Sequence, residues 1–188
     1  MNPLENILNS RNIMYHGTSS DCVTSLRRGI VLESSRKRTD FGVGFYLTAN
    51  KEQAAKWAML KADFVGIPDV FGAVMSYEID IEKLIRCSNL FFDEADDFWA
   101  DFIFANRVLD EEEHNNINGV YDVVFGPLGD GFKFANNIKR RQKGAIDTKE
   151  FRKSITNPKY PFPEYHQFSL HTQRGLGIVS LKGVDFVG

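Results

Sequence analysis

The sequence predicts an α+β protein in which many short strands are interspersed with a few helices. About seven to nine stretches have the composition or alternation of β-strands, and three or four segments have helical features. The 16 Phe residues suit a sheet-based fold with aromatic packing. At 188 residues the chain is expected to form a single domain over 1–188, with its core from about residue 12 to 187.

The N-terminal part is expected to begin with a polar lead-in over residues 1–11, followed by a strand over 12–16. Ser19–Asp21 supplies N-cap residues for a short helix that Gly29 ends. A brief strand is expected over 30–32. A charged loop over 33–38 then leads into the most informative stretch of the sequence.

That stretch is Asp40–Trp57. Gly42 and Gly44 allow a tight turn into a short apolar strand over 45–47. Asn50 fits an N-cap, with Gln53 completing a capping box, and the helix from 51 to about 63 contains no Gly or Pro. Tyr46 is near the end of the strand and Trp57 lies in the second turn of the helix. Their two rings either face a common cleft or belong to the core.

Further along, alternating or apolar runs predict strands over 70–79, 84–87, 121–126, 164–172, 179–181 and 184–187. An amphipathic helix is expected over 92–108, with Trp99 in its apolar stripe and therefore in the core. Residues 132–155 are expected to be helical and basic, after a strand–helix turn at 126–131. That turn lacks the Gly-Lys-(Ser/Thr) ending of a phosphate-binding loop.

Charge is distributed unevenly, although the net charge is only −2. Residues 93–113 contain nine acids and one base, whereas 133–159 contain nine bases and two acids. The two cysteines are expected to be free thiols, and no cluster of His and Cys indicates a metal site. Without an apolar leader or a run of 18 apolar residues, the sequence predicts a cytoplasmic protein with no membrane contact.

Two motifs give the sequence a specific resemblance. Tyr15-His16-Gly17-Thr18 ends the first strand, and Asp40-Phe-Gly-Val-Gly-Phe-Tyr46-Leu-Thr is followed by Gln53-Ala-Ala-Lys-Trp57-Ala. This pattern resembles the diphtheria-toxin-like branch of the ADP-ribosyltransferase superfamily, which includes the poly(ADP-ribose) polymerases. It is most similar to small bacterial domains of that superfamily, several of them toxins. The motifs cover residues 13–58, and weaker similarity continues to about residue 182.

The resemblance implies an ADP-ribosyltransferase-like fold, with two apposed, mostly antiparallel sheets around an NAD cleft and flanking helices. It places nicotinamide between Tyr46 and Trp57, with its amide on the Gly17 backbone and a ribose hydroxyl on His16. Two aromatic faces suit a flat cationic ring through stacking and cation–π attraction. The NAD site is further expected to include Thr18, Gly44 and Gln53.

The third catalytic position of this branch lies on a late strand and is usually Glu. Here Gln167 occupies that place, so the resemblance implies the catalytic set His16, Tyr46 and Gln167. Strand alternation puts Gln167, Ser169 and His171 on one face. The other candidates on this strand are His166, His171 and Glu164, and a lone His on a strand is more often structural.

The expected activity is NAD-dependent mono-ADP-ribosyl transfer to a macromolecule, with release of nicotinamide. Gln167 can hydrogen-bond ribose but cannot take a proton, which favours single transfer over chain elongation. The alternatives are an NAD glycohydrolase, in which water is the acceptor, and a catalytically silent module that binds NAD or ADP-ribose. The related RNA 2′-phosphotransferases do not place Tyr at position 46.

Partners follow from the same resemblance and from charge. Arg36 and Arg38 are candidates for pyrophosphate binding, or they belong to a solvated loop. The basic segment 133–159 is expected to bind a nucleic-acid acceptor, to balance the acidic segment 93–113, or to dock an acidic protein partner. Protein is the other acceptor considered, and a toxin of this type would have an antitoxin protein as a partner.

Overall fold

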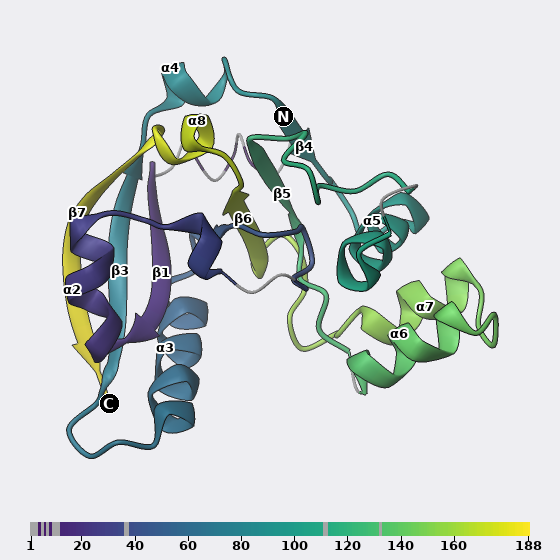
Figure 1. Ribbon diagram of the computed structural model, residues 1–188, viewed down its shortest axis with the longest axis horizontal. Coiled ribbons are helices and arrows are strands. Elements are labelled where there is room, and N and C mark those ends of the chain that lie inside the picture. Colours follow the sequence, from purple (N-terminus) through teal and green to yellow (C-terminus); the bar gives the residue numbers. More distant parts are fainter. Residues whose placement is uncertain are drawn as a thin grey trace.

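The computed structural model describes residues 12–35, 38–110, 113–131 and 133–188, together with Leu4, Asn6 and Leu8. It is an α+β structure with two sheets, one of three strands and one of four, and helices beside both (Figure 1). Seven strands are present among the described residues, at the lower end of the number expected from the sequence. Four helices there have eight or more residues.

The first sheet contains β1 (Ile13–Ser19), β3 (Gly72–Ile79) and β7 (Val179–Val187) in the order β1-β3-β7, all antiparallel. Helix α3 (Lys51–Val65) packs on this sheet through Ala54, Ala58 and Ala62, which recur every fourth residue. The helix approaches β1 so closely that a Cβ at Gly17 would lie 2.1 Å from the carbonyl oxygen of Ala54. Gly17 is therefore required by packing.

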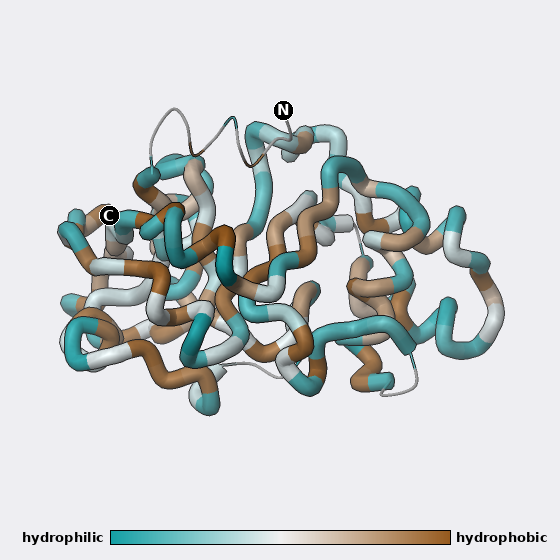
Figure 2. Tube along the Cα trace, turned by 90° about the horizontal axis from the view of Figure 1, so that it is seen from above, coloured by the Kyte–Doolittle hydropathy of each residue, from teal (hydrophilic) through white to brown (hydrophobic). Residues whose placement is uncertain are grey.

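The second sheet has the order β2-β6-β5-β4, with β2 (Phe45–Leu47), β6 (His166–Leu170), β5 (Val123–Pro127) and β4 (Asn89–Phe91). Only β4 and β5 are parallel. One core cluster takes side chains from both sheets, including Met14, Phe45, Met75 and Phe168, so the sheets pack against each other. Figure 2 shows hydrophobic segments passing through the middle of the molecule.

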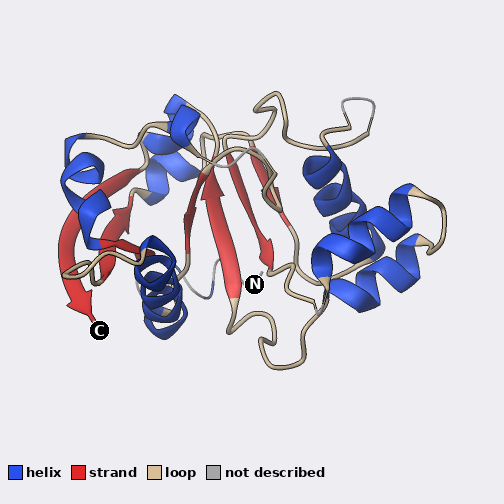
Figure 3. Cartoon of the chain, turned by 60° about the horizontal axis from the view of Figure 1, so that its bottom comes forward, coloured by secondary structure: helices blue, strands red, loops and turns tan. Residues whose placement is uncertain are grey.

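A second core cluster covers the other face of this four-stranded sheet. Its helices are α5 (Asp97–Val108), α6 (Phe134–Gln142) and α7 (Thr148–Ile155), which lie together at the end of the molecule away from β7 (Figure 3). Trp99 is fully buried there, as the helical periodicity predicts. Its indole N–H donates to the carbonyl of Pro127 at 3.2 Å.

Several boundaries differ from the sequence prediction for local reasons. The helix expected from residue 92 begins at Asp97, because the Asp96 side chain caps it by accepting from the Trp99 N–H at 2.7 Å. The strand expected over 84–87 is wrong. Asp80 instead caps a short helix, α4 (Ile81–Leu84), and the next strand starts at Asn89.

The strand expected over 30–32 is also wrong, since the chain forms a 3-10 helix at Leu32–Ser34 after the short helix α2 (Val23–Arg28). The two strands expected over 179–181 and 184–187 are one strand, β7, which accommodates an irregularity opposite Ser76 and Tyr77. A last short helix, α8 (Gln173–Leu176), joins β6 to β7. No helix among the described residues has the length and apolar composition needed to cross a bilayer.

Candidate functional site

Strands β1 and β2 connect the two sheets at one point and then separate. Tyr15 and Thr48 exchange both backbone hydrogen bonds, at 2.7 and 3.0 Å. In an antiparallel ladder the next such pair lies two residues on, at Gly17 and Tyr46. The ladder does not continue there, because Tyr15–Thr48 is an isolated bridge. The backbone polar groups of Gly17 and Tyr46 therefore face an interruption between the strands.

Side chains occupy two of these backbone groups. His16 Nδ1 donates to the carbonyl of Tyr46 at 2.8 Å, and Lys61 Nζ donates to the carbonyl of Gly17 at 2.7 Å. The structure thus brings together His16 and Tyr46, which are 30 residues apart in sequence. Lys61 was not identified from the sequence. Its position four residues after Trp57, on the same side of helix α3, was the available signal.

The tautomer of His16 follows from its partner. A carbonyl only accepts, so the proton is on Nδ1 and Nε2 is left as an acceptor. The ring stacks on Phe45 at a centroid distance of 4.3 Å. Burial, together with the nearby Lys61 ammonium, lowers the pKa of His16 to about 3. The imidazole is therefore neutral at physiological pH. Thr18, two residues along β1, is buried within the sheet.

Hydrogen bonds hold both the backbone carbonyl and the side-chain hydroxyl of Tyr46. Its hydroxyl lies in the turn that precedes β2, where it donates to Gly42 O at 2.7 Å, accepts from the Phe41 N–H at 3.0 Å and lies 3.0 Å from Thr39 Oγ1. Burial raises the pKa of Tyr46 well above its usual value, so the phenol stays protonated. Because the hydroxyl is used in the turn, the ring is the part of Tyr46 that a ligand could contact.

Trp57 lies on the stripe of helix α3 that also carries Gln53 and Lys61, at intervals of four residues. Gln53 bridges the ends of two strands: its Oε1 accepts from Thr48 Oγ1 at 3.1 Å and its Nε2 donates to His166 O at 2.9 Å. Lys61 reaches Gly17. Trp57 lies between these two anchor points and is 58% exposed. Trp57 is therefore not a core residue.

One expectation about this helix needs correction. Asn50 is the N-cap, accepting from the Gln53 N–H at 3.0 Å, but the Gln53 side chain does not complete a capping box because it bonds to Thr48 and His166 instead. Among the described aromatic pairs, Tyr46 contacts His171 at a centroid distance of 6.1 Å and no pair joins it to Trp57.

Gln167 is buried, and its amide is bound to a carboxylate that the sequence analysis did not single out. Gln167 Nε2 donates to Asp40 Oδ2 at 2.7 Å and to Pro127 O at 3.2 Å. Asp40 is itself buried and forms an ion pair with Arg107, whose Nη2 lies 2.6 Å from Oδ1. Asp40 begins the quoted Asp-Phe-Gly motif, which was the available signal.

The other candidate histidines on this strand have structural roles. His166 Nε2 accepts from the Ala49 N–H at 2.9 Å and its Nδ1 donates to Pro163 O at 2.9 Å. His171 Nδ1 donates to Val43 O at 2.8 Å. Burial lowers the pKa of each to about 4. Gly44 fits closely against His171, because a Cβ there would lie 2.7 Å from Nδ1.

Of the two arginines expected to bind pyrophosphate, the structure describes only Arg38. Arg36 lies outside the described residues. Arg38 is exposed, and its backbone carbonyl accepts from Arg107 Nη1 at 2.7 Å. Glu164 is also exposed, and its carbonyl accepts from Asn50 Nδ2 at 3.1 Å.

Part of the basic segment 133–159 balances the acidic helix, as one of its expected interpretations predicted. Arg141 pairs with Asp101 and lies over the rings of Phe104 and Phe151, and Arg152 pairs with Asp97 at 3.2 Å. These contacts hold α6 and α7 against α5. Lys139, Arg140 and Lys143 are exposed.

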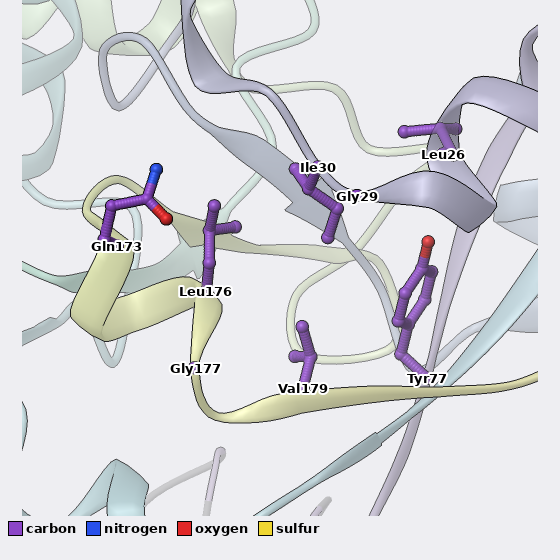
Figure 4. Close-up of a pocket in the computed structure, with 8 residues that line it drawn as sticks. All are labelled: Leu26, Gly29, Ile30, Tyr77, Gln173, Leu176, Gly177 and Val179. Carbon is purple, nitrogen blue, oxygen red and sulfur yellow. The ribbon is translucent and has the colours of Figure 1, made fainter.

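Two surface pockets lie elsewhere. A pocket of about 390 Å³ is lined by Leu26, Gly29, Ile30, Tyr77, Gln173, Leu176, Gly177 and Val179 (Figure 4). Another, of about 310 Å³, is lined by Lys83, Arg86, Cys87, Gln173, Arg174 and Gly177. Neither includes a residue of the predicted NAD site. In the described part of the chain, no group of three or more His, Cys, Asp or Glu could hold a metal ion.

The chain belongs to a protein family described as "Protein of unknown function (DUF3990)", whose model matches residues 12–181. The match begins just before β1 and ends within β7, so it includes all seven strands at least in part. No curated protein and no solved structure matches the chain.

Proposed function

We propose that this protein has an ADP-ribosyltransferase-like fold and is an NAD-dependent mono-ADP-ribosyltransferase that modifies a macromolecule. The observation that carries the proposal is the separation of β1 and β2 at Gly17 and Tyr46. At that point a strand edge offers backbone hydrogen-bonding groups beside a neutral imidazole and the anchored Tyr46, and the exposed indole of Trp57 is on the helix that packs against Gly17.

The chemistry of nicotinamide fits these groups. Its carboxamide has both a donor and an acceptor, which match the C=O and N–H of Gly17 on an unpaired strand edge. Its cationic ring suits the faces of Tyr46 and Trp57, with a cation–π attraction of about 0.5–2 kcal/mol. Binding in this way requires Lys61 to release the Gly17 carbonyl.

His16 would position the ribose. Its Nδ1–H is used by the Tyr46 carbonyl, so the free Nε2 can accept a hydrogen bond from a ribose hydroxyl. A neutral His16 also adds no positive charge beside the ribose carbon that becomes cationic during the reaction.

In the proposed reaction the bond between the ribose carbon and the nicotinamide nitrogen breaks, and its electron pair leaves with neutral nicotinamide. A nucleophile on the acceptor then bonds to the oxocarbenium-like ribose carbon and loses its proton. Cation–π attraction weakens as the ring becomes neutral, so Tyr46 and Trp57 bind and orient NAD but do not lower the barrier. Gln167 cannot remove the proton of a second hydroxyl, which favours single transfer.

A silent NAD-binding module is the second candidate, because the third position carries an amide whose Nε2 is already committed to Asp40 and Pro127. The toxin-type role, with an antitoxin partner and a cytoplasmic acceptor, rests on the sequence resemblance alone. The acceptor is either protein or nucleic acid.

The decisive experiment uses NAD with separate labels on nicotinamide and on adenine, incubated with the protein and a cell lysate. Release of nicotinamide together with adenine label on protein or nucleic acid supports the proposal. Release without transfer identifies an NAD glycohydrolase, and binding without release identifies a silent module. If calorimetry detects no NAD binding, the proposal is wrong.

A further inference from the structure

The side-chain amide of Gln167 has a fixed orientation. Its nitrogen contacts two groups, the Asp40 carboxylate at 2.7 Å and the Pro127 carbonyl at 3.2 Å. Both of these groups can only accept hydrogen bonds, so each must receive one of the two Nε2 hydrogens. Rotating the amide by 180° would put Oε1 against two acceptors. The structure therefore leaves Oε1 as the free atom of Gln167, and that atom is a pure acceptor.

The Asp40 carboxylate is fixed by three hydrogen bonds in addition to the one from Gln167. Its Oδ1 accepts from Arg107 Nε at 2.9 Å and Nη2 at 2.6 Å, and its Oδ2 accepts from the Gly129 N–H at 3.2 Å as well as from Gln167. These four hydrogen bonds use the acceptor capacity of an ionised carboxylate. A carboxylate that accepts from an amide N–H also increases the negative charge on that amide's oxygen.

The residue that carries this carboxylate also belongs to the turn that binds Tyr46. Asp40 lies in the turn whose Phe41 N–H and Gly42 carbonyl bind the Tyr46 hydroxyl. Tyr46 is opposite Ser169 in the β2–β6 register, so Gln167 is its diagonal neighbour on the same face of the sheet, about 7–8 Å away between Cα atoms. Asp40 is thus hydrogen-bonded to the Gln167 amide and belongs to the turn that anchors Tyr46.

We propose that Asp40 is a positioning residue that makes Gln167 act like a carboxylate oxygen, so that Oε1 accepts a hydrogen bond from a hydroxyl of the bound ligand. The proposal rests on the proposed function for the identity of that ligand, a ribose of NAD. It explains how a chain with Gln at the third position retains a negatively polarised acceptor there. The negative charge is on Asp40, which is hydrogen-bonded to Gln167 and is held in place by Arg107 and Gly129.

The test is a double-mutant cycle with Asp40→Asn, Gln167→Glu and both changes together. Gln167→Glu alone puts two carboxylates in contact, and their repulsion raises the pKa of the pair. The free energy of unfolding of this variant should therefore fall as the pH rises through that pKa. Asp40→Asn in that background replaces one of the two carboxylates with an amide that can donate to the new carboxylate at position 167. The double variant should therefore recover part of the lost stability. Asp101→Asn, which removes a carboxylate from the Arg141 ion pair, is the matched control.

Three measurements separate positioning from a purely structural role. Urea unfolding gives the coupling between positions 40 and 167. The NMR signals of the Gln167 side-chain amide should move in Asp40→Asn and stay in place in Asp101→Asn. Nicotinamide release by Asp40→Asn should show a kcat about ten- to a hundredfold lower, as expected for loss of one charge-assisted hydrogen bond, with KM nearly unchanged.

The outcomes also separate this inference from the proposed function. Additive stability effects, or an unmoved Gln167 amide signal in Asp40→Asn, would overturn the fixed orientation. Clear coupling with a wild-type kcat in Asp40→Asn would overturn the positioning role. A wild-type protein that neither binds nor cleaves NAD contradicts the proposed function and the ribose as ligand, while the unfolding and NMR measurements still decide the orientation.

Discussion

Lys61 Nζ lies 2.7 Å from the carbonyl oxygen of Gly17, at the point where β1 no longer pairs with β2. The proposed nicotinamide site therefore holds a positive charge in the ligand-free protein. That charge competes for the same carbonyl that the carboxamide would use, and it repels a cationic ring. It is also the second cause, after burial, of the low pKa of His16.

We expect Lys61→Met to bind NAD several-fold more tightly than the wild type, because the carbonyl and its surroundings are released from the ammonium. The His16 pKa should rise in the variant yet stay below its ordinary value, since burial is its main cause. Calorimetry and an NMR titration of His16 measure the two effects. Weaker NAD binding in the variant would show that Lys61 contacts the dinucleotide itself.

Replacing Trp57 tests whether its ring binds NAD, and the result is not complicated by a loss of folding. Because its side chain is 58% exposed, Trp57→Ala should leave stability within about 0.5 kcal/mol of the wild type. NAD affinity should fall by about 1–2 kcal/mol, the value of a cation–π contact with its stacking. Trp57→Phe should retain part of the NAD affinity that Trp57→Ala loses.

The matched control for Trp57 is Phe64→Ala, which removes an aromatic side chain that is 85% exposed on the same helix. Phe64 lies nearly two turns further along α3, so its loss should not change NAD affinity. Equal affinities of the Trp57 and Phe64 variants would remove Trp57 from the site.

The pH dependence of stability should be set in part by two buried histidines. His166 and His171 have pKa values of about 4 in the folded protein and an ordinary value of 6.5. Between these values the unfolded chain binds more protons than the folded chain, so the free energy of unfolding rises with pH. Their contribution is complete above pH 6.5 and is lost as the pH falls toward 4, on the order of a few kcal/mol each.

Urea unfolding from about pH 4 to 7 measures this slope. His171→Asn should reduce it by about one proton, although the variant will also be less stable because the bond to Val43 O is altered. A slope that is the same with and without His171 would show that this imidazole is not neutral in the folded state.

The sequence predicted the fold class and most of the strands because short alternating runs and the glycines at 42 and 44 are local signals. It also predicted the buried Trp99, since that position follows from helical periodicity. The short helix at Ile81–Leu84 was missed because its cap, Asp80, stabilises only one turn. The local sequence pattern does not show whether one capped turn will form a helix or a strand.

For the site, sequence motifs identified His16 and Tyr46, which the structure joins by a hydrogen bond. Lys61 and Asp40 were missed for a different reason. Their partners are Gly17 and Gln167, 44 and 127 residues away. The spacing from Trp57 and the Asp-Phe-Gly motif were signals for the two residues, but they did not indicate these contacts. A lysine on a helix and an aspartate in a turn are ordinary until the fold brings them to these positions.

The basic segment can now be divided by what each residue contacts. Arg141 is bound to Asp101 and covered by Phe104 and Phe151, so Arg141→Gln should destabilise the helices by about 1–3 kcal/mol. Any loss of transfer in that variant would follow from unfolding and says nothing about an acceptor. Thermal unfolding of Arg141→Gln checks this assignment.

Lys139, Arg140 and Lys143 are exposed, so changing all three to Glu should leave the fold and nicotinamide release intact. If they bind a polyanionic acceptor, transfer should fall and its dependence on salt should become shallower, because fewer counterions are released on binding. Lys83 and Arg86, changed to Glu beside the pocket of about 310 Å³, provide a control with similar charge at another surface. Transfer that is unchanged in the triple variant would assign the whole basic segment to balancing the acidic helix, since the two arginines that pair with α5 already show that role.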